Sequence, residues 1–465
     1  MTGSALGGAA DRDRDRVIQA LAGEPDRFRV IRAPSVPGGL GPDEVDELSR
    51  LAGPDRSQGP RLPVPDGWTE LRVRGVHQTL LLTDAVRSRG VLAQIAVTLS
   101  GTPGARPGEA PAADVLPVPQ DLALAVERWS GGGWNGVHAS WLHHGPDGVI
   151  QHRRWDLPAA GGVEVTVTSR YAAALGKYLD HRVDAMVAGL EASDAGPWPG
   201  SVDQAAERFS QWQAGRQLPA PMPDPITLGP AGVDWIDRLP QLAEASRGRL
   251  EVAPPAAPAD AVTAGLAQAD GTPTESGRRI SRTRREARTR LDIHRTDATG
   301  TSARGRMWID EDRALAVAAP SVPESHHQVG LYPRPRTAEL ILRMIGFVPE
   351  GPHVPPEDPL TWEQLFASPS ASEGLEGPAN PLQAWWASPR ALWQVVPHLR
   401  EGGSAHRSDT AGQAVGPVLQ ILTVPGFGHY RCLPSGPGSP ARFRLEAVSG
   451  LALLQHVRDW CRSLS

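Results

Sequence analysis

One order of hydrophobic patterns occurs three times along the chain, and it constrains the fold more than any other feature. Each copy begins with short runs in which apolar and polar residues alternate, separated by turn residues. Each copy ends with apolar residues spaced three and four apart, which predicts a helix with one buried face. The copies lie at about 137–186, 289–347 and 418–461. The pattern predicts a repeated module of antiparallel strands followed by a helix. Residue identity between the copies is low, so a chance repeat is the alternative to a true duplication.

These modules predict an α+β protein with additional helices and long loops rich in proline and glycine. The chain has 465 residues, with 50 Gly and 46 Pro, which is too long for one ordinary core and contains many breaks. We expect a partly disordered and helical segment at 1–67 and an α+β domain at 68–249. A linker that ends in an arginine-rich segment follows at 250–288, and an α+β domain of two modules occupies 289–465.

Local patterns predict further helices outside the modules. Asp121–Trp129 has the composition of a helix that ends at a glycine run beginning with Gly131. Two segments, Ser201–Gln204 and Thr361–Gln364, fit a capping box, in which side chains satisfy the free amides of a first helical turn.

The composition argues against several kinds of chemistry. The net charge is −5, so the whole chain gives no electrostatic reason to bind nucleic acid or a membrane surface. Lys177 is the single lysine, and it lies in a helical pattern rather than in a P-loop, a kinase strand or a Schiff-base site. This scarcity of lysine beside many arginines is typical of a high-GC bacterium.

Cysteine content and hydropathy indicate the compartment. The two cysteines, Cys432 and Cys461, are too few for a four-thiolate metal site or a framework of several disulfides. That count suits a reducing environment. We find no apolar run long enough to span a membrane and no secretory signal pattern at the N-terminus. We therefore expect a cytoplasmic protein without membrane insertion.

Histidines are the first candidates to consider for a metal or catalytic site. The positions are His143, His144, His152, His326, His327 and His406. Adjacent histidines on a strand point to opposite faces, so neither adjacent pair forms a metal site by itself. Known metal and nucleophile motifs are absent. We read these residues as surface or strand histidines unless different segments bring them together, and we assign no catalytic, cofactor-binding or metal-binding residue.

Arginines are concentrated in one short segment. The candidates for binding an anion or an acidic partner are Arg278, Arg279, Arg282, Arg284, Arg285 and Arg288. Such a density of positive charge favours a phosphate-rich or acidic partner, and the alternative is a solvated segment before the next strand. No aromatic residue interrupts the cluster, so it does not resemble a platform for stacking single-stranded nucleic acid.

Tryptophans form the second candidate site, for a protein partner. The chain has 14 Trp against 6 Phe and 4 Tyr. The candidates are Trp362, Trp385, Trp386 and Trp393. In one uninterrupted helix Trp386 and Trp393 would share a face, but Pro389 lies between them and favours a break. These tryptophans either pack in a core or form a face that binds a partner helix, since aromatic anchors dominate interfaces.

Two segments carry a resemblance to a known family. The strands "TRLDIHRTD", "RGRMWID" and "RALAVAA", followed by "VGLYPRP" and the helix "TAELILRMIGF", resemble the closing module of EspG-type chaperones of type VII secretion. The C-terminal "ARFRLEAVSGLALLQHVRDW" is similar to it as well. The resemblance implies a cytoplasmic protein with a quasi-two-fold α+β fold. It further implies binding to the tip of helical substrate pairs, without catalysis.

These observations lead to one functional expectation and two alternatives. We expect a non-catalytic cytoplasmic adaptor or chaperone-like protein that binds another protein, without a cofactor. The resemblance makes a helical substrate of type VII secretion the expected partner. One alternative is an enzyme whose site lies in an inter-domain cleft. The other is a nucleic-acid-associated regulator that uses the arginine cluster.

Overall fold

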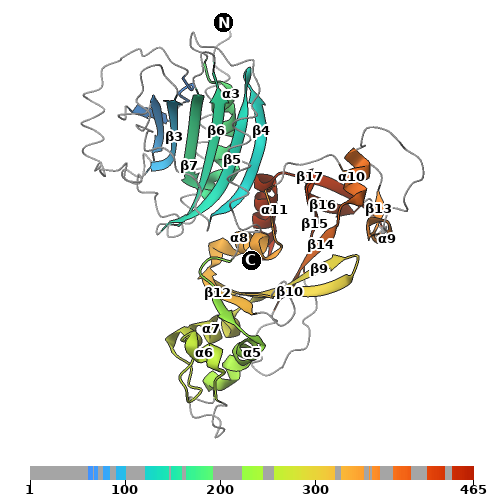
Figure 1. Ribbon diagram of the computed structural model, residues 1–465. Helices are drawn as coiled ribbons and strands as arrows, with labels where there is room; N and C mark the ends of the chain where they lie inside the picture. Colours follow the sequence, from blue (N-terminus) through green and yellow to red (C-terminus); the bar gives the residue numbers. More distant parts are fainter. Residues whose placement is uncertain are drawn as a thin grey trace. The chain divides into compact units, whose positions relative to one another are not determined.

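The computed structural model describes much of the chain after residue 60. The described residues are 61–65, 68–71, 77–83, 91–100, 121–145, 148–159, 164–191, 222–244, 256–319, 326–349, 355–356, 359–366, 381–399, 416–434 and 442–464. They belong to two compact units, unit 1 at 1–217 and unit 2 at 218–465 (Figure 1). Nearly all of the expected segment 1–67, the capping box at Ser201–Gln204 and His406 lie outside the described residues.

Unit 1 is built on one antiparallel sheet of seven strands in the order β1-β2-β3-β7-β6-β5-β4. The strands are β1 (Trp68–Leu71), β2 (Gln78–Thr83), β3 (Val91–Ser100), β4 (Leu122–Gly131), β5 (Trp134–Gly145), β6 (Gly148–Pro158) and β7 (Glu164–Ala172). A short 3-10 turn, η2 (Ala173–Leu175), leads directly from β7 into helix α3 (Gly176–Ala188).

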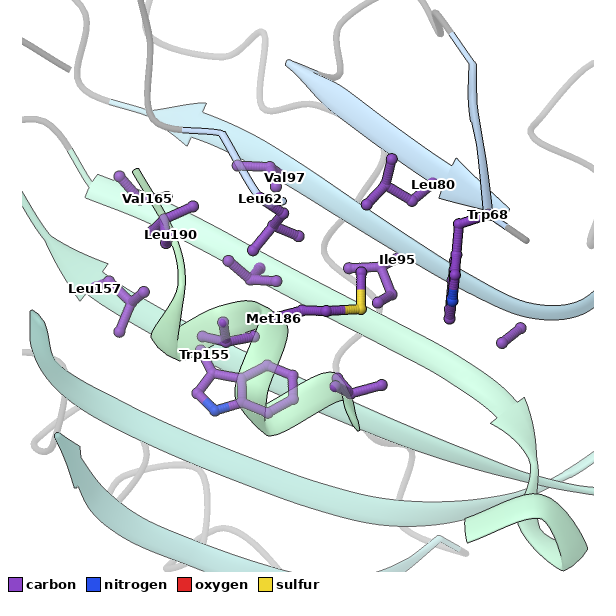
Figure 2. Packing of buried hydrophobic residues seen from close by; sticks show 14 of the residues in the cluster. Leu62, Trp68, Leu80, Ile95, Val97, Trp155, Leu157, Val165, Met186 and Leu190 are labelled. Carbon is purple, nitrogen blue, oxygen red and sulfur yellow. The ribbon is translucent and has the colours of Figure 1, made fainter. Parts of the chain in front are cut away.

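Helix α3 covers one face of this sheet and closes a hydrophobic core. Every second residue of the central strands faces the helix, as the strand period of two requires. Ile95 on β3, Trp155 and Leu157 on β6 and Val165 on β7 pack there with Met186 of α3 (Figure 2). Trp155 and Leu157 are fully buried in this core.

The helix expected at Asp121–Trp129 is wrong, because this segment forms strand β4. Its alanines and leucines have high helix propensity, but pairing along β5 overrides that preference. A bulge between Ala123 and Ala125 also shifts the register, so the apolar residues do not alternate as they would in a regular strand.

Unit 2 is built on an antiparallel sheet of ten strands in the order β13-β17-β16-β15-β14-β9-β10-β11-β12-β8. The strands are β8 (Ile226–Leu228), β9 (Thr289–Asp297), β10 (Gly300–Ile309), β11 (Arg313–Ala318), β12 (His327–Pro333), β13 (Leu360–Thr361), β14 (Ala391–Leu399), β15 (Leu419–Val424), β16 (Gly428–Pro434) and β17 (Arg442–Val448).

This strand order is symmetric about its centre. Strands β9 to β12 and strands β14 to β17 are two consecutive meanders, and their first strands pair with each other, with Ile293 opposite Val395. The last strand of each meander also pairs with a strand from earlier in the chain, β8 or β13. Strands β4 to β7 of unit 1 repeat the same plan, with β3 beside β7. A helix follows every meander, so the three predicted modules share one topology.

Helices cover both faces of the unit 2 sheet. They are α5 (Pro230–Glu244), α6 (Ala259–Thr263), α7 (Glu275–Glu286), the 3-10 turn η4 (Arg334–Arg336), α8 (Thr337–Met344), α9 (Trp362–Phe366), α10 (Pro381–Ala387) and α11 (Gly450–Ser463). Helices α5 to α7 pack on Trp308 and Leu315. Helix α8 packs on the other face, where Gly305 leaves room for Met344, and it contacts α11.

The segment 250–288, expected to be a linker, contains two packed helices. Ala261 of α6 and Ile280 of α7 are buried in the same core as Trp235 of α5. The division between the compact units falls at Gln217 and Leu218 instead. Alanine, glycine and proline are typical of linkers, and here they also allow short helices to pack closely.

Pro389 divides the tryptophan-rich stretch into two elements. Helix α10 ends at Ala387, and Trp393 lies on strand β14, so the helix that would align Trp386 with Trp393 does not form. The capping box at Thr361–Gln364 is confirmed: the amide of Gln364 donates to Oγ1 of Thr361 at 3.2 Å, and the amide of Thr361 donates to Oε1 of Gln364 at 2.8 Å.

The two sheets with their helices confirm the α+β class. None of the helices in the described part of the chain combines the length and apolar character needed to cross a lipid bilayer.

Candidate functional site

Four side chains lie in one row across the sheet of unit 1. Gln94 on β3 is directly opposite Arg170 on β7, Arg170 is opposite His152 on β6, and His152 is opposite Trp141 on β5. Tyr171 belongs to the core beside α3, and successive strand residues point to opposite faces. The row therefore lies on the sheet face that is turned away from α3.

The guanidinium of Arg170 is hydrogen-bonded to a neutral amide, whereas arginines in such half-buried positions are commonly paired with a carboxylate. Its Nε donates to Oε1 of Gln94 at 2.8 Å, and Nη2 donates to the same oxygen. Arg170 is half-buried, and no aspartate or glutamate among the described residues pairs with it. Because burial disfavours the charged form, the pKa of Arg170 falls to about 10.

His152 and Trp141 form a stacked aromatic pair beside Arg170. Their ring centroids are 5.3 Å apart and their planes are inclined by 8°. Burial, followed by the charges of Arg170 and His143, lowers the pKa of His152 to about 3, so its imidazole is neutral at neutral pH. His152 is 8% exposed, and neither ring nitrogen has a hydrogen-bond partner among the described residues. The buried indole nitrogen of Trp141 has no acceptor either.

His143 extends this site toward β4. Its Nδ1 is 3.0 Å from Oδ1 of Asp121, and its ring meets His152 edge-on at 5.9 Å. The fold thus assembles two of the candidate histidines from neighbouring strands, while His326 and His327 lie in unit 2. Over the described ranges, no three His, Cys, Asp or Glu side chains are grouped so that they could hold a metal ion.

The next two residues along the same face of β6, Arg154 and Asp156, have balanced charges. Arg154 donates from Nε to both carboxylate oxygens of Asp156, at 2.9 and 3.1 Å. Thr166 donates to Oδ1 of the same carboxylate at 2.8 Å. The chain therefore supplies Arg154 with a buried carboxylate, but leaves Arg170 with an amide.

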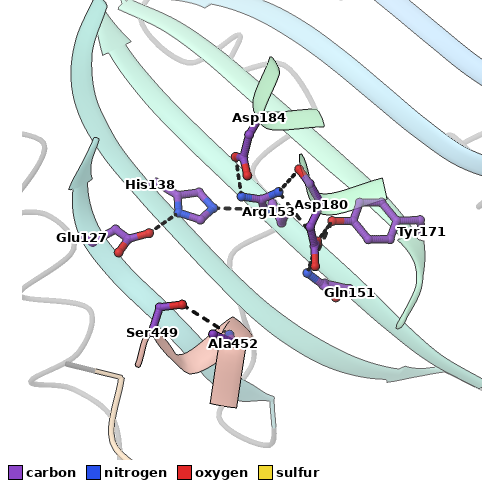
Figure 3. A network of polar contacts seen from close by, with 9 residues as sticks. All are labelled: Glu127, His138, Gln151, Arg153, Tyr171, Asp180, Asp184, Ser449 and Ala452. Atoms are coloured by element: carbon purple, nitrogen blue, oxygen red, sulfur yellow. Dashed lines mark hydrogen bonds and ion pairs between the residues drawn. The ribbon is translucent and has the colours of Figure 1, made fainter. Parts of the chain in front are cut away.

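The opposite face of the sheet holds a second polar network, which attaches α3 to the strands (Figure 3). Arg153 on β6 is the centre of this network. It donates from Nη2 to Asp184 at 2.6 Å and from Nη1 to the carbonyl oxygen of Asp180 at 3.0 Å. Tyr171 donates to the carboxylate of Asp180, and Gln151 donates to it at 2.8 Å. Side chains from β6 and β7 thereby hold two successive turns of α3.

His138 joins this network to β4. Nε of Arg153 donates to Nε2 of His138 at 3.2 Å, and Nδ1 of His138 is 3.0 Å from Oε1 of Glu127. Since Nε2 must accept from arginine, the proton of the neutral ring lies on Nδ1 and points to Glu127. Burial and the charge of Arg153 lower the pKa of His138, despite the opposing effect of Glu127. These polar groups satisfy one another, so the network has a structural role.

The structure places three of the four candidate tryptophans around one core in unit 2. Trp385 is 1% exposed and donates from Nε1 to the hydroxyl of Tyr430 at 3.0 Å. Trp386 and Trp362 are half-buried and pack against the same core. Trp393 lies apart on β14, where Arg295 stands over its ring at 5.9 Å. These placements favour the core-packing alternative for this group.

Five of the six candidate arginines lie at the surface of α7 or directly after it, and the sixth, Arg284, does not. Arg278, Arg279 and Arg282 are exposed, and the first two are paired with the exposed Glu275. Arg285 and Arg288 also form surface ion pairs, with Glu286 and Glu311 respectively. Ile280 and the inward residues beside it fix the helix against the core.

Arg284 has a structural role that the sequence pattern did not predict. It is 13% exposed, and its Nη1 donates to the carbonyl oxygen of Ile236 at 3.0 Å and to that of Asp237. Pro240 follows Ile236 by four residues in α5 and has no backbone N–H, so this carbonyl lacks its usual helical donor. Arg284 supplies a donor from α7 instead, and it stacks over Trp308 at 5.2 Å.

The two cysteines are weak nucleophiles. Burial raises the pKa of both Cys432 and Cys461 to about 12. Both thiols are therefore protonated at neutral pH, whereas nucleophilic catalysis uses a thiolate.

The sequence pattern did not predict the row formed by Gln94, Arg170, His152 and Trp141. His152 was a candidate there, but Gln94 and Arg170 were not. The four residues come from segments up to 76 positions apart, and their alignment depends on the register of three strand pairs. Alternation in each strand indicates the face of each residue but not its partner across the sheet.

Among the comparisons with known proteins, matches come from solved structures. No protein-family model and no curated protein sequence matches the chain. Structures that resemble parts of it include LpqN of Mycobacterium tuberculosis, involved in cell envelope biogenesis, at 12% identity, with 28% of this chain and 83% of LpqN covered and a TM-score of 0.22. The PsbP protein CyanoP of Synechocystis is 14% identical, over 30% of this chain and 89% of CyanoP, with a TM-score of 0.22. A Bacteroides thetaiotaomicron protein is 9% identical over 56% of this chain and 82% of its own, with a TM-score of 0.20. These scores are too low for any of the three likenesses to carry an argument.

Proposed function

We propose that this chain is a non-catalytic cytoplasmic adaptor or chaperone-like protein that binds an acidic protein surface through the arginines of α7. The observation that carries the proposal is the set of Arg278, Arg279 and Arg282, which is exposed on one rigidly packed helix. Glu275 is the carboxylate that pairs with the first two, and Arg282 has no partner among the described residues.

Arginines fixed on a packed helix can bind an acidic protein surface more tightly than the same arginines on a flexible segment. Holding long side chains on a helix that is already packed reduces the ordering cost on binding. Opposite charge on the partner would steer association and fix its orientation. Nucleic acid is less favoured, because no aromatic side chain accompanies these arginines and the chain carries a net charge of −5.

The resemblance to EspG-type chaperones adds a class of partner to this proposal. Those proteins have a quasi-two-fold α+β fold and bind helical secretion substrates, and the symmetric strand order of unit 2 agrees with such a fold. A helical substrate of type VII secretion with an acidic tip is therefore the proposed partner.

The test is a pull-down with the tagged full-length chain from the native cells in moderate salt. Wild type is compared with R278E/R279E/R282E and with a matched control, R442E/R444E/R462E, which reverses three exposed arginines on β17 and α11. A protein recovered near stoichiometry is then purified and titrated against all three chains.

The proposal predicts an acidic, helical partner whose affinity falls at least tenfold with the α7 triple variant and changes little with the control. The wild-type affinity should also weaken steeply as salt is raised. Equal affinities for the two triple variants would contradict the α7 site. Recovery of nucleic acid that is lost on nuclease treatment would support the regulator instead.

A further inference from the structure

On strands β6 and β7, Arg170 is the arginine that has no carboxylate partner among the described residues. Three arginines lie on β6 and β7, and two of them have carboxylates within hydrogen-bonding distance: Arg153 with Asp184 and Arg154 with Asp156. Arg153 and Arg154 are buried, whereas Arg170 is half-buried, and its described partner is the side-chain amide of Gln94. A desolvated cation without an anion is unfavourable, and folding alone gives no reason to retain one.

The hydrogen bonds to Gln94 leave part of the guanidinium unused. Gln94 accepts from Nε and Nη2, on one side of the planar fork. Nη1 and the second hydrogen of Nη2 form the outer edge of the fork, and these two donors can bind a carboxylate or phosphate through parallel hydrogen bonds. Because Gln94 fixes the plane of the guanidinium, that edge is oriented before any ligand arrives.

His152 supplies a second recognition element next to that edge. It lies directly opposite Arg170 in the strand register and is 8% exposed, yet its ring nitrogens have no partner among the described residues. A neutral imidazole always carries one N–H that can donate to an oxyanion. Stacking on Trp141 fixes the plane of this ring as well.

We propose that the row formed by Gln94, Arg170, His152 and Trp141 is a binding site for an oxyanion, either a carboxylate or a phosphate group of a small molecule. Arg170 binds the group through the outer edge of its guanidinium, and His152 donates a further hydrogen bond. Gln94 and Trp141 position these two side chains. The site lies in unit 1 and is independent of the arginine face on α7.

The direct test follows the side-chain Nε–H signal of Arg170 by ¹⁵N NMR in the full-length chain, assigned by its absence in Arg170→Gln. Inorganic phosphate and acetate are titrated separately at constant ionic strength. The proposal expects a saturable shift of this signal with at least one probe, and the probe that binds more tightly identifies the group. A signal that does not move with either probe would overturn it.

A second measurement uses thermal unfolding of the same chains. The better probe should raise the melting temperature of wild type more than that of Arg170→Gln at equal concentration. Arg128→Gln, which changes an exposed arginine on β4, should respond as wild type does. An equal response of wild type and Arg170→Gln would show a general salt effect and overturn the proposal.

Discussion

Arg153 donates from Nε to Nε2 of His138 at 3.2 Å, so one guanidinium both fixes the tautomer of a buried histidine and holds α3 to the sheet. The same side chain binds Asp184 and the backbone of Asp180. Its removal would take a donor from three polar groups, and Nε2 of the buried His138 would lose the donor shown here.

Arg153→Met should therefore lower the free energy of unfolding by about 3 kcal/mol, the lower end for breaking a buried ion pair, because Asp184 is partly exposed. Urea denaturation measures this loss. Lys177→Met removes an exposed cation from α3 and should change stability by less than about 0.5 kcal/mol. Similar losses of stability for the two variants would contradict the conclusion that the contacts of Arg153 hold α3 to the sheet.

His152 should make the protein less stable in mild acid. Its pKa is about 3 in the folded chain and 6.5 in the unfolded chain, so between these values the unfolded state binds the extra proton. Stability due to this residue is thus complete above pH 6.5 and is lost as pH falls, at up to about 1.4 kcal/mol per pH unit. Denaturation at pH 7, 6 and 5 should show this slope in wild type relative to His152→Gln. The exposed His181→Gln should retain the slope of wild type.

Arg284 and Pro240 should be coupled energetically. Arg284→Met leaves the carbonyl of Ile236 without a donor and should cost about 1–3 kcal/mol. Pro240→Ala restores an N–H within α5, so the same arginine change should cost less in that background. A double-mutant cycle measures the difference. Strictly additive effects would show that Arg284 stabilises the protein through Trp308 or Asp237 instead.

Gly277 should reverse the usual preference for alanine in a helix. Alanine normally stabilises a helix interior by about 1 kcal/mol relative to glycine. A Cβ at Gly277 would lie 2.2 Å from the backbone oxygen of Leu266, which cannot rotate away. Gly277→Ala should thus destabilise by about 1–3 kcal/mol. Ser276→Ala, its exposed neighbour, should be neutral or stabilising, and a gain for both would refute the close contact.

Trp385 should behave as a core residue. Trp385→Ala should cost about 3–5 kcal/mol, because it removes a fully buried ring and its hydrogen bond to Tyr430. Val418→Ala, at an exposed apolar position, should cost less than about 0.5 kcal/mol. Unchanged stability with Trp385→Ala would reopen the partner-binding interpretation of this group.

The sequence predicted those parts of the fold in which pattern and propensity agree. Strand alternation and the helix at Thr337–Met344 indicated the module beginning at Thr289, and Thr361 and Gln364 formed the expected cap. Strand β4 was misread because its alanines and leucines favour a helix, and only pairing with β5 makes it a strand.

The candidate sites were less predictable, for a physical reason. The arginine density on α7 was visible, but the separate role of Arg284 depends on a carbonyl in another helix. That Arg170 meets an amide rather than a described carboxylate depends on which residues face it from β3 and β6. Such properties belong to the register between distant strands, and a single strand carries no information on its partner's register.

The pairing of β9 with β14 has a consequence for the order of folding. Each meander of unit 2 joins strands that follow one another along the chain, so it can form through short loop closures. Leu291 meets Pro397 only after a far longer loop has closed. Both meanders should therefore form before they join, and each would then expose the edge of its first strand. During synthesis, the interval between the emergence of β9 and that of β14 is the period in which this half-built sheet is most prone to pair with another chain.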